Sequence, residues 1–195
     1  SNKVGAYTSK NNRVERELGT EMVHGETIIV EYYEPTAVTG EGSFTISSVV
    51  HGYRSLDRIQ KELEKGVNDS GNCNIDVNCP LGDDWGDQIR SVAMIVVSGN
   101  GICTGALINN TCGDGRFLFL TANHCLGGST ASWSSRFNWE SPEGTESCAT
   151  VAGSTNPGSP YDQTANGATV LASSGGSDFA LLEIDNMTVE EAEEL

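Results

Sequence analysis

The second part of the chain is a series of short apolar stretches separated by glycine-rich turns, and this pattern restricts the fold class most. Stretches of a few residues rich in β-branched and aromatic side chains are typical of strands. Six stretches fit: 92–98, 102–108, 116–121, 131–139, 168–173 and 179–184. This spacing predicts an all-β domain, a small Greek-key barrel. We expect the serine- and glycine-rich stretch 147–167 to be a long loop, and the capping box Thr188/Glu191 predicts a helix start.

The first part of the chain has a different pattern. Residues 26–34 and 43–50 predict two strands of a β-hairpin, and residues 55–65 predict a helix with an apolar stripe. The glycine-, asparagine- and serine-rich residues 66–72 read as a linker. We therefore place a boundary between Lys65 and Cys73. It divides the chain into a β segment, 1–65, and a β domain, 66–195.

Charge excludes several classes of partner. The 195 residues carry a formal net charge of −16, which disfavours nucleic acid and anionic membranes. No apolar run approaches the length of a membrane span, and the polar residues 1–13 show no signal peptide. The acidic stretch GDDWGD at 82–87 is compatible with a calcium loop or with solubilising charge.

All six cysteines follow Lys65 at irregular spacings, without a C-x-x-C pair. Zinc sites favour close pairs, whereas an even number of scattered cysteines favours disulfides formed in an oxidising compartment. We therefore expect a secreted protein without metal or cofactor. The sequons at Asn68, Asn109 and Asn186 are compatible with secretion.

His124 lies where an apolar run ends, in LTANHC at 120–125. A catalytic base, a metal ligand and a core histidine are the three interpretations. A serine or cysteine protease needs a histidine base and an acid that fixes its tautomer. Asp178 is the candidate acid, because it precedes the apolar run 179–182 and is expected to sit at the lip of a buried strand, where a carboxylate can be shielded from water. We assign His24 and His51 structural or solvated roles.

Several ordered motifs carry a family resemblance. They are GNCNIDVNCP at 71–80, IRSVAMIVVSGNGICTGALINNT at 89–111, FLTANHC at 119–125 and SDFALLEI at 177–184. Residues 66–184 resemble the chymotrypsin-like (trypsin-like) serine proteases, and among them the bacterial lysyl endopeptidases. The resemblance implies a fold of two barrels, of which this chain holds the first. It implies His124 as general base, Asp178 as its orienter, and protein or peptide substrates cleaved after lysine.

The nucleophile of that family has no counterpart here. The family places its serine after the aspartate in a Gly-Asp-Ser-Gly type motif, and nothing after Asp178 fits. The resemblance thus assigns the serine, the oxyanion hole and the specificity pocket to a missing C-terminal barrel of the same protein. We expect this chain alone to be inactive. The alternatives are a non-catalytic binding or adhesive module that lost its serine, and a disulfide-rich β-domain with no catalytic history.

The resemblance also implies disulfide pairings. It pairs Cys103 with Cys125 and Cys79 with Cys148, and it gives Cys73 a partner in the missing barrel. Cys112 departs from the family pattern, and pairing with Cys73 or with a cysteine elsewhere both stay open.

The lysines suggest self-processing. Residues 66–195 contain three arginines but no lysine, whereas residues 1–65 contain four lysines. The resemblance places the mature start at a glycine shortly before the first cysteine, which is Gly66, directly after Lys65. A lysine-specific protease that matures itself needs lysine at this junction. The alternative is that an acidic secreted domain is simply poor in lysine. We therefore expect cleavage between Lys65 and Gly66, with residues 1–65 a propeptide or an accessory β-domain.

Overall fold

The computed structural model describes residues 5–9, 12, 16–20, 23, 26–51, 75, 77–98, 101–140 and 163–193. Its strands are β1 (Val92–Val97), β2 (Gly101–Ile108), β3 (Leu118–Thr121), β4 (Ser134–Phe137), β5 (Thr164–Asn166), β6 (Ala168–Ser174) and β7 (Phe179–Ile184). Its helices are the α-helices α2 (Gly86–Ser91) and α3 (Val189–Glu193) and the 3₁₀ helices η2 (Thr36–Val38), η4 (Pro80–Trp85), η5 (Asn123–Cys125) and η6 (Thr130–Ser132). Within the described residues, every helix is too short or too polar to traverse a lipid bilayer.

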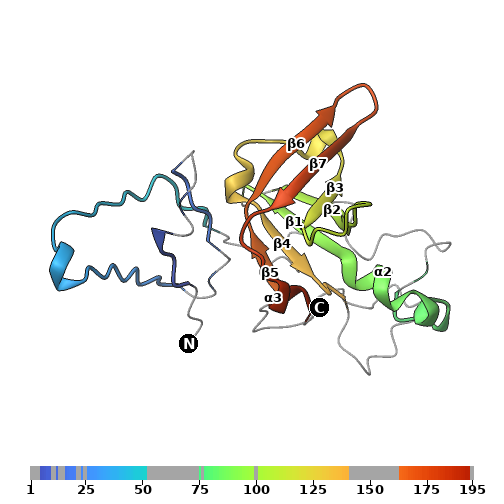
Figure 1. The fold of residues 1–195 in the computed structure, drawn as a ribbon, viewed down its shortest axis with the longest axis horizontal. Helices are drawn as coiled ribbons and strands as arrows, with labels where there is room; N and C mark the ends of the chain where they lie inside the picture. The colour runs from blue at the N-terminus through green and yellow to red at the C-terminus, as the bar shows by residue number, and fades with distance from the viewer. Residues whose placement is uncertain are drawn as a thin grey trace.

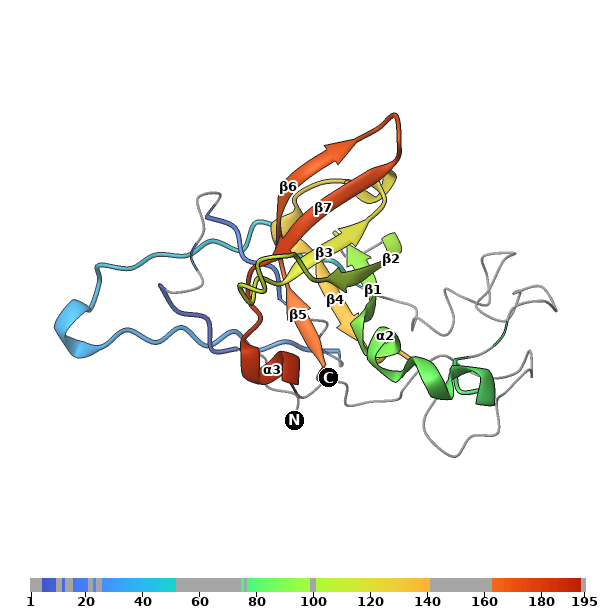
Figure 2. The same cartoon turned by 45° about the vertical axis from the view of Figure 1, so that its right-hand side comes forward.

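The strands form one antiparallel sheet in the order β5-β4-β1-β2-β3-β7-β6 (Figure 1). Strands β1, β2 and β3 follow each other as neighbours, β4 returns beside β1, and β7 returns beside β3. The three consecutive strands β1, β2 and β3 therefore lie between two strands, β4 and β7, that return from later in the chain. Figure 2 shows the β6–β7 hairpin extending at one end of the sheet and α2 lying at the other end.

The sheet curls because its two edge strands are consecutive in the chain. Only Gly167 separates β5, which pairs with β4, from β6, which pairs with β7. Gly167 has a φ of +75°, a left-handed conformation that glycine adopts without steric cost. Its N–H donates to the Trp133 carbonyl at 2.8 Å, and its own carbonyl accepts from the Asp185 N–H at 3.2 Å. One bent segment therefore reaches both margins of the sheet.

Alternate residues of the strands fill the inside of the curl, as the two-residue period of a strand requires. Ala93 and Ile95 of β1 and Leu182 of β7 are almost completely buried. The largest fully buried side chains are Trp133, Phe119, Phe137, Ile95 and Leu182. The Phe119 and Phe137 rings meet edge to face, with centroids 6.3 Å apart. The core therefore joins strands from both halves of the sheet.

The mostly β prediction is confirmed, and all six predicted strands are present. Two of them end earlier than predicted, each at a residue with a left-handed backbone. Strand β1 stops before Ser98 and β4 stops before Asn138, and both residues have a φ of +48°. Strand β5 was missed inside the expected loop 147–167, because three residues carry too little pattern to be recognised. The rest of that loop up to residue 162 lies outside the described residues.

The helix start at Thr188 was predicted from the sequence, whereas helices η4 and α2 were not. The capping box is confirmed: the Thr188 N–H donates to Glu191 Oε2 at 2.8 Å, and the Glu191 N–H donates to Thr188 Oγ1 at 3.2 Å. Helices η4 and α2 were not expected in the acidic stretch 82–87, because neither contains a buried residue that would give it an apolar period.

The predicted β-hairpin at 26–34 and 43–50 is wrong. Residues 26–51 are extended and almost entirely exposed, and η2 is their only regular element. Their turn is closed by the Glu34 carboxylate, which accepts the N–H groups of Gly40 and Gly42 at 2.7 and 3.0 Å. A hairpin without a third strand or a packed face is marginally stable, so β-branched residues alone do not produce pairing. The predicted helix at 55–65 and the boundary between Lys65 and Cys73 lie outside the described residues.

A test of the core concerns Gly105 of β2. A Cβ atom there would lie 2.3 Å from Phe119 Cε1 and 2.9 Å from the Leu120 carbonyl oxygen, so either the ring or the backbone of β3 must shift. We expect Gly105→Ala to lower the free energy of unfolding by about 1–3 kcal/mol, the usual cost of overpacking. Urea denaturation of both proteins measures this difference.

Gly127→Ala is the matched control, because its Cβ would meet only Val97 Cγ1, at 4.0 Å. Equal stability of the two variants would contradict the close packing of β2 on β3.

Candidate active site

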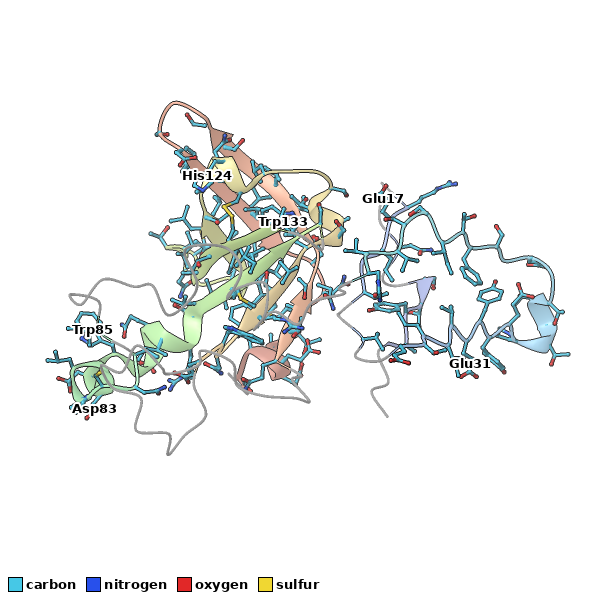
Figure 3. All side chains as sticks on the ribbon, turned by 180° about the vertical axis from the view of Figure 1, so that it is seen from behind. Glu17, Glu31, Asp83, Trp85, His124 and Trp133 are labelled. Carbon is cyan, nitrogen blue, oxygen red and sulfur yellow. A yellow bond between two sulfur atoms is a disulfide. The ribbon has the colours of Figure 1, made fainter. Side chains whose placement is uncertain are left out.

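His124 is carried by η5, the single turn that follows β3. Thr121 ends β3 with its hydroxyl donating to the Thr104 carbonyl of β2 at 2.7 Å. Cys125, next to His124, is buried and forms a disulfide with Cys103 of β2, 22 residues earlier. The backbone on both sides of the histidine is therefore attached to β2. Figure 3 shows His124 at the outer end of the sheet, whereas Trp133 lies within it.

Asp178 ends the turn between β6 and β7. It has a φ of +52°, which aspartate tolerates better than most residues. The buried side chains of Ala180 and Leu182 anchor β7 directly behind it. Because Thr121 pairs with Ala180 across β3 and β7, the end of β3 and the start of β7 lie side by side. This pairing delivers His124 and Asp178 to the same point.

The two side chains touch, although 54 positions separate them in sequence. Asp178 Oδ2 lies 2.7 Å from His124 Nδ1, and Oδ1 accepts the His124 backbone N–H at 2.9 Å. The Asn123 N–H donates to the Asp178 carbonyl at 3.2 Å. A carboxylate can only accept, so Nδ1 carries the proton and Nε2 keeps a free lone pair. The geometry thus fixes the tautomer that a general base needs.

The electrostatics of the pair follow from these bonds. The hydrogen bond from the His124 ring, followed by that from its backbone N–H, holds the pKa of Asp178 below its ordinary value of 3.8. The expectation of a carboxylate shielded from water is wrong, because the side chains of His124 and Asp178 are 70% and 52% exposed. Every second side chain of β7, the strand that follows Asp178, is buried, but the turn that carries Asp178 lies at the surface. The attraction between the pair is therefore screened by solvent.

An ion pair holds the opposite end of the same two strands. The Arg116 guanidinium, just before β3, donates from Nε and Nη2 to the Glu183 carboxylate of β7 at 2.9 and 2.6 Å. This fork lowers the pKa of Glu183 below its ordinary value, chiefly through the hydrogen bond from Arg116. The sequence offered no signal for this contact, since the two residues are 67 positions apart. A side-chain contact thus joins β3 and β7 at each end of their ladder.

The cysteines stand as follows. Cys103 and Cys125 are joined, as the family resemblance implied. Cys79 is disulfide-bonded to a cysteine outside the described residues, so its pairing with Cys148 stays a prediction. Cys112 is an exposed free thiol, which rules out its pairing with Cys73 in this structure. Cys73 and the processing residues Lys65 and Gly66 lie outside the described residues.

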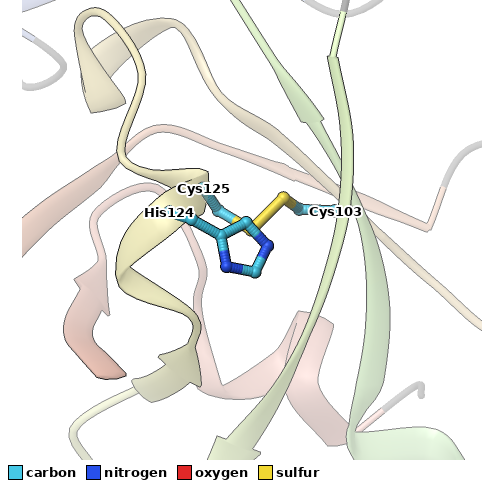
Figure 4. A group of neighbouring side chains, drawn as sticks. All are labelled: Cys103, His124 and Cys125. Carbon is cyan, nitrogen blue, oxygen red and sulfur yellow. A yellow bond between two sulfur atoms is a disulfide. The ribbon is translucent and has the colours of Figure 1, made fainter. Parts of the chain in front are cut away.

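A metal ion has one possible donor group in the described part of the chain. The donor atoms of Cys103, His124 and Cys125 lie within 4.8 Å of one another (Figure 4). The two sulfurs are bonded to each other, and a cysteine binds a metal only as a free thiolate. This group therefore offers no metal site while the disulfide is intact. In the acidic stretch 82–87, Asp87 forms an ion pair with Arg90 of the same helix.

The other polar residues add no third member to the pair. In the described part of the chain, the hydrogen bonds of His124 go to Asp178 alone and none comes from a serine hydroxyl. His51 is exposed, and His24 lies outside the described residues. The bond from Thr121 to the Thr104 carbonyl was missed, because a threonine that ends a strand gives no signal of its partner.

The contact between His124 and Asp178 predicts a titration. Because the pKa of Asp178 in the folded chain lies below 3.8, the contact stabilises the fold fully above about pH 3.8 and is lost as the pH falls through the lowered pKa. We expect His124→Ala to raise the pKa of Asp178 toward its ordinary value, as measured by carbon NMR of the carboxyl groups.

Asp114 is the internal control, because its pKa is lowered chiefly by the Asn110 side chain and should not move in this variant. An unchanged pKa of Asp178 would show that the imidazole does not hold the carboxylate.

The sequence of this chain matches a family model. Residues 67–193 match the model of the lysyl endopeptidase C-terminal domain. The match covers more than half of the chain and includes β1 to β7, His124 and Asp178. The chain therefore belongs to the lysyl endopeptidase C-terminal domain family, a family of peptidases.

Proposed function

We propose that this chain is part of a secreted serine endopeptidase that cleaves after lysine, with His124 as general base and Asp178 as its orienting acid. The observation that carries the proposal is the two-point contact of Asp178 with the ring Nδ1 and backbone N–H of His124. In this arrangement Nε2 takes the proton of a serine hydroxyl as the hydroxyl attacks the peptide carbonyl. Asp178 then stabilises the imidazolium that forms. The imidazolium later returns the proton to the leaving amine.

The serine and the oxyanion donors come, in this proposal, from a second barrel of the same protein. Apolar side chains beside the pair support this: Leu120 and Phe179 are 40% and 38% exposed. Both alternate with buried core residues, so they face outward, and Leu120 pairs with Leu181 across β3 and β7. Grouped outward apolar side chains mark interaction surfaces. A second barrel packed here would bury them and remove water from His124.

The curled sheet supports the same interpretation of the fold. The continuous segment through Gly167 pairs with β4 at one margin and with β7 at the other. When one bent segment forms both edge strands of a sheet, the sheet has the connectivity of a small closed barrel. We propose that this sheet is the first barrel of a trypsin-like fold.

Lysine preference and self-processing rest on the sequence and on the family. The family match begins at residue 67, close to Gly66. Residues 66–195 contain no lysine, so a lysine-specific enzyme would not cut itself there. We propose that residues 1–65 are a propeptide or accessory segment that is released by cleavage after Lys65. The disulfides of Cys103, Cys125 and Cys79 support secretion.

The first test uses the complete protein that contains this chain and peptide substrates with lysine or arginine before the cleaved bond. We expect Asp178→Asn to lower kcat about 10⁴-fold, because the wrong tautomer of the base prevails. His124→Ala should lower kcat about 10⁶-fold. The purified 195-residue chain should show no amide hydrolysis.

Asp114→Asn is the control and should leave kcat unchanged, because Asp114 is hydrogen-bonded to Asn110 and does not contact the pair. A complete protein without peptidase activity would favour the alternative, a non-catalytic binding module of the same fold.

The second test concerns processing. The complete protein should mature with Gly66 at its N-terminus, as read by mass spectrometry. Its Asp178→Asn variant should stay uncut, and added active enzyme should cut it. Maturation at another residue, or normal maturation of Lys65→Gln, would reject the role of Lys65.

A further inference from the structure

His124 lies beside the disulfide between Cys103 and Cys125. Cys125 follows His124 in η5, and Cys103 lies on the adjacent strand β2. One donor atom of each of the three residues lies within 4.8 Å of the other two. Figure 4 shows the imidazole beside the disulfide. Two sulfurs and one nitrogen this close have the composition of a Cys₂His metal site, with the sulfurs at present joined to each other.

A dithiol reductant would convert this group into a donor set. The disulfide accepts two electrons and two protons and becomes two thiols, while the dithiol becomes a disulfide. A divalent zinc-class ion then displaces the two thiol protons and binds two thiolates. With Zn–S bonds of about 2.3 Å, tetrahedral geometry needs the sulfurs only about 3.8 Å apart. Rotation of the two cysteine side chains separates them that far.

The backbone around the donors does not depend on the disulfide alone. Cys103 lies within the ladder of β1 and β2, paired with Ile95. On the other side, η5 is held to the β6–β7 turn by the Asn123 N–H, which donates to the Asp178 carbonyl at 3.2 Å. Thr121 ties the end of β3 to β2 through its hydroxyl. These bonds keep the donors near one another after the sulfurs part.

The histidine is already oriented as a ligand. Metal-binding histidines commonly donate the other ring N–H to a carboxylate, which fixes the tautomer and raises the basicity of the ligating nitrogen. Asp178 takes this place at Nδ1, at 2.7 Å, and leaves Nε2 for an ion. Because the His124 side chain is 70% exposed, a fourth position stays open to water.

We propose that the reduced chain binds one zinc-class divalent ion through Cys103, Cys125 and His124, with water as the fourth ligand and Asp178 as the carboxylate that orients His124. The binding does not depend on peptidase activity. Its consequence rests on the proposed function: an ion on Nε2 occupies the lone pair that accepts the serine proton. The same histidine then serves proton transfer when the disulfide is intact and metal binding when the disulfide is reduced.

The test uses the 195-residue chain, reduced with a phosphine without oxygen and titrated with Co²⁺ as a spectroscopic probe for zinc. We expect one equivalent to give the intense visible bands of tetrahedral cobalt together with thiolate charge-transfer absorption, and Zn²⁺ to displace it. Cys103→Ser with Cys125→Ser should abolish the bands. His124→Ala should change the band pattern and weaken binding more than tenfold, and Asp178→Asn should weaken it 10–100-fold.

Two controls test a cysteine and a histidine outside this site. Cys112→Ser and His51→Ala should leave the cobalt spectrum and affinity unchanged. Thermal unfolding of the reduced chain provides a second measurement, and Zn²⁺ should raise the midpoint of the wild type but not that of His124→Ala. The proposal is overturned if His124→Ala gives the wild-type cobalt spectrum, if the reduced chain binds no cobalt, or if it stays unfolded whether or not zinc is added. None of these readouts involves peptide hydrolysis, so their failure leaves the proposed peptidase untouched.

Discussion

The antiparallel ladder between β3 and β7 is the interaction on which the site depends. It matches Thr121 with Ala180 and so brings a histidine and an aspartate from distant parts of the sequence to one corner of the sheet. Arg116 and Glu183 fasten one end of this strand pair, and His124 and Asp178 fasten the other. Because a side-chain contact lies at each end of this apolar ladder, a change of register would break both contacts at once. Fold and site are therefore specified by the same hydrogen bonds.

The sequence was informative where a pattern repeats or where chemistry needs a rare residue. Alternating apolar residues identified the strands that form the sheet, and Thr188 with Glu191 identified a helix start. His124 and Asp178 were found because each adjoins an apolar strand. The resemblance to a protease family supplied their order. Sequence position alone could not show that the carboxylate also binds the backbone N–H of its partner.

The failures have a common cause. The exposed arms at 26–34 and 43–50 have a strong strand pattern, but pairing also needs a packed face, which local sequence does not reveal. Strand β5 has a weak pattern, yet it forms because β4 offers it an edge. The exposure of Asp178 was misjudged for a related reason: burial at the end of a strand depends on what covers the turn. In each instance tertiary context overrode a local tendency.

The bend at Gly167 also has a mechanical consequence. In an ordinary open sheet each margin can fray independently, because different pieces of chain form the two outer strands. Here a single segment serves as both outer strands, so peeling it from β4 pulls on its attachment to β7 through one residue. The corner that carries His124 and Asp178 is thereby linked to the far margin of the sheet. Loosening either border should release the other, which makes the whole curl open as one cooperative unit.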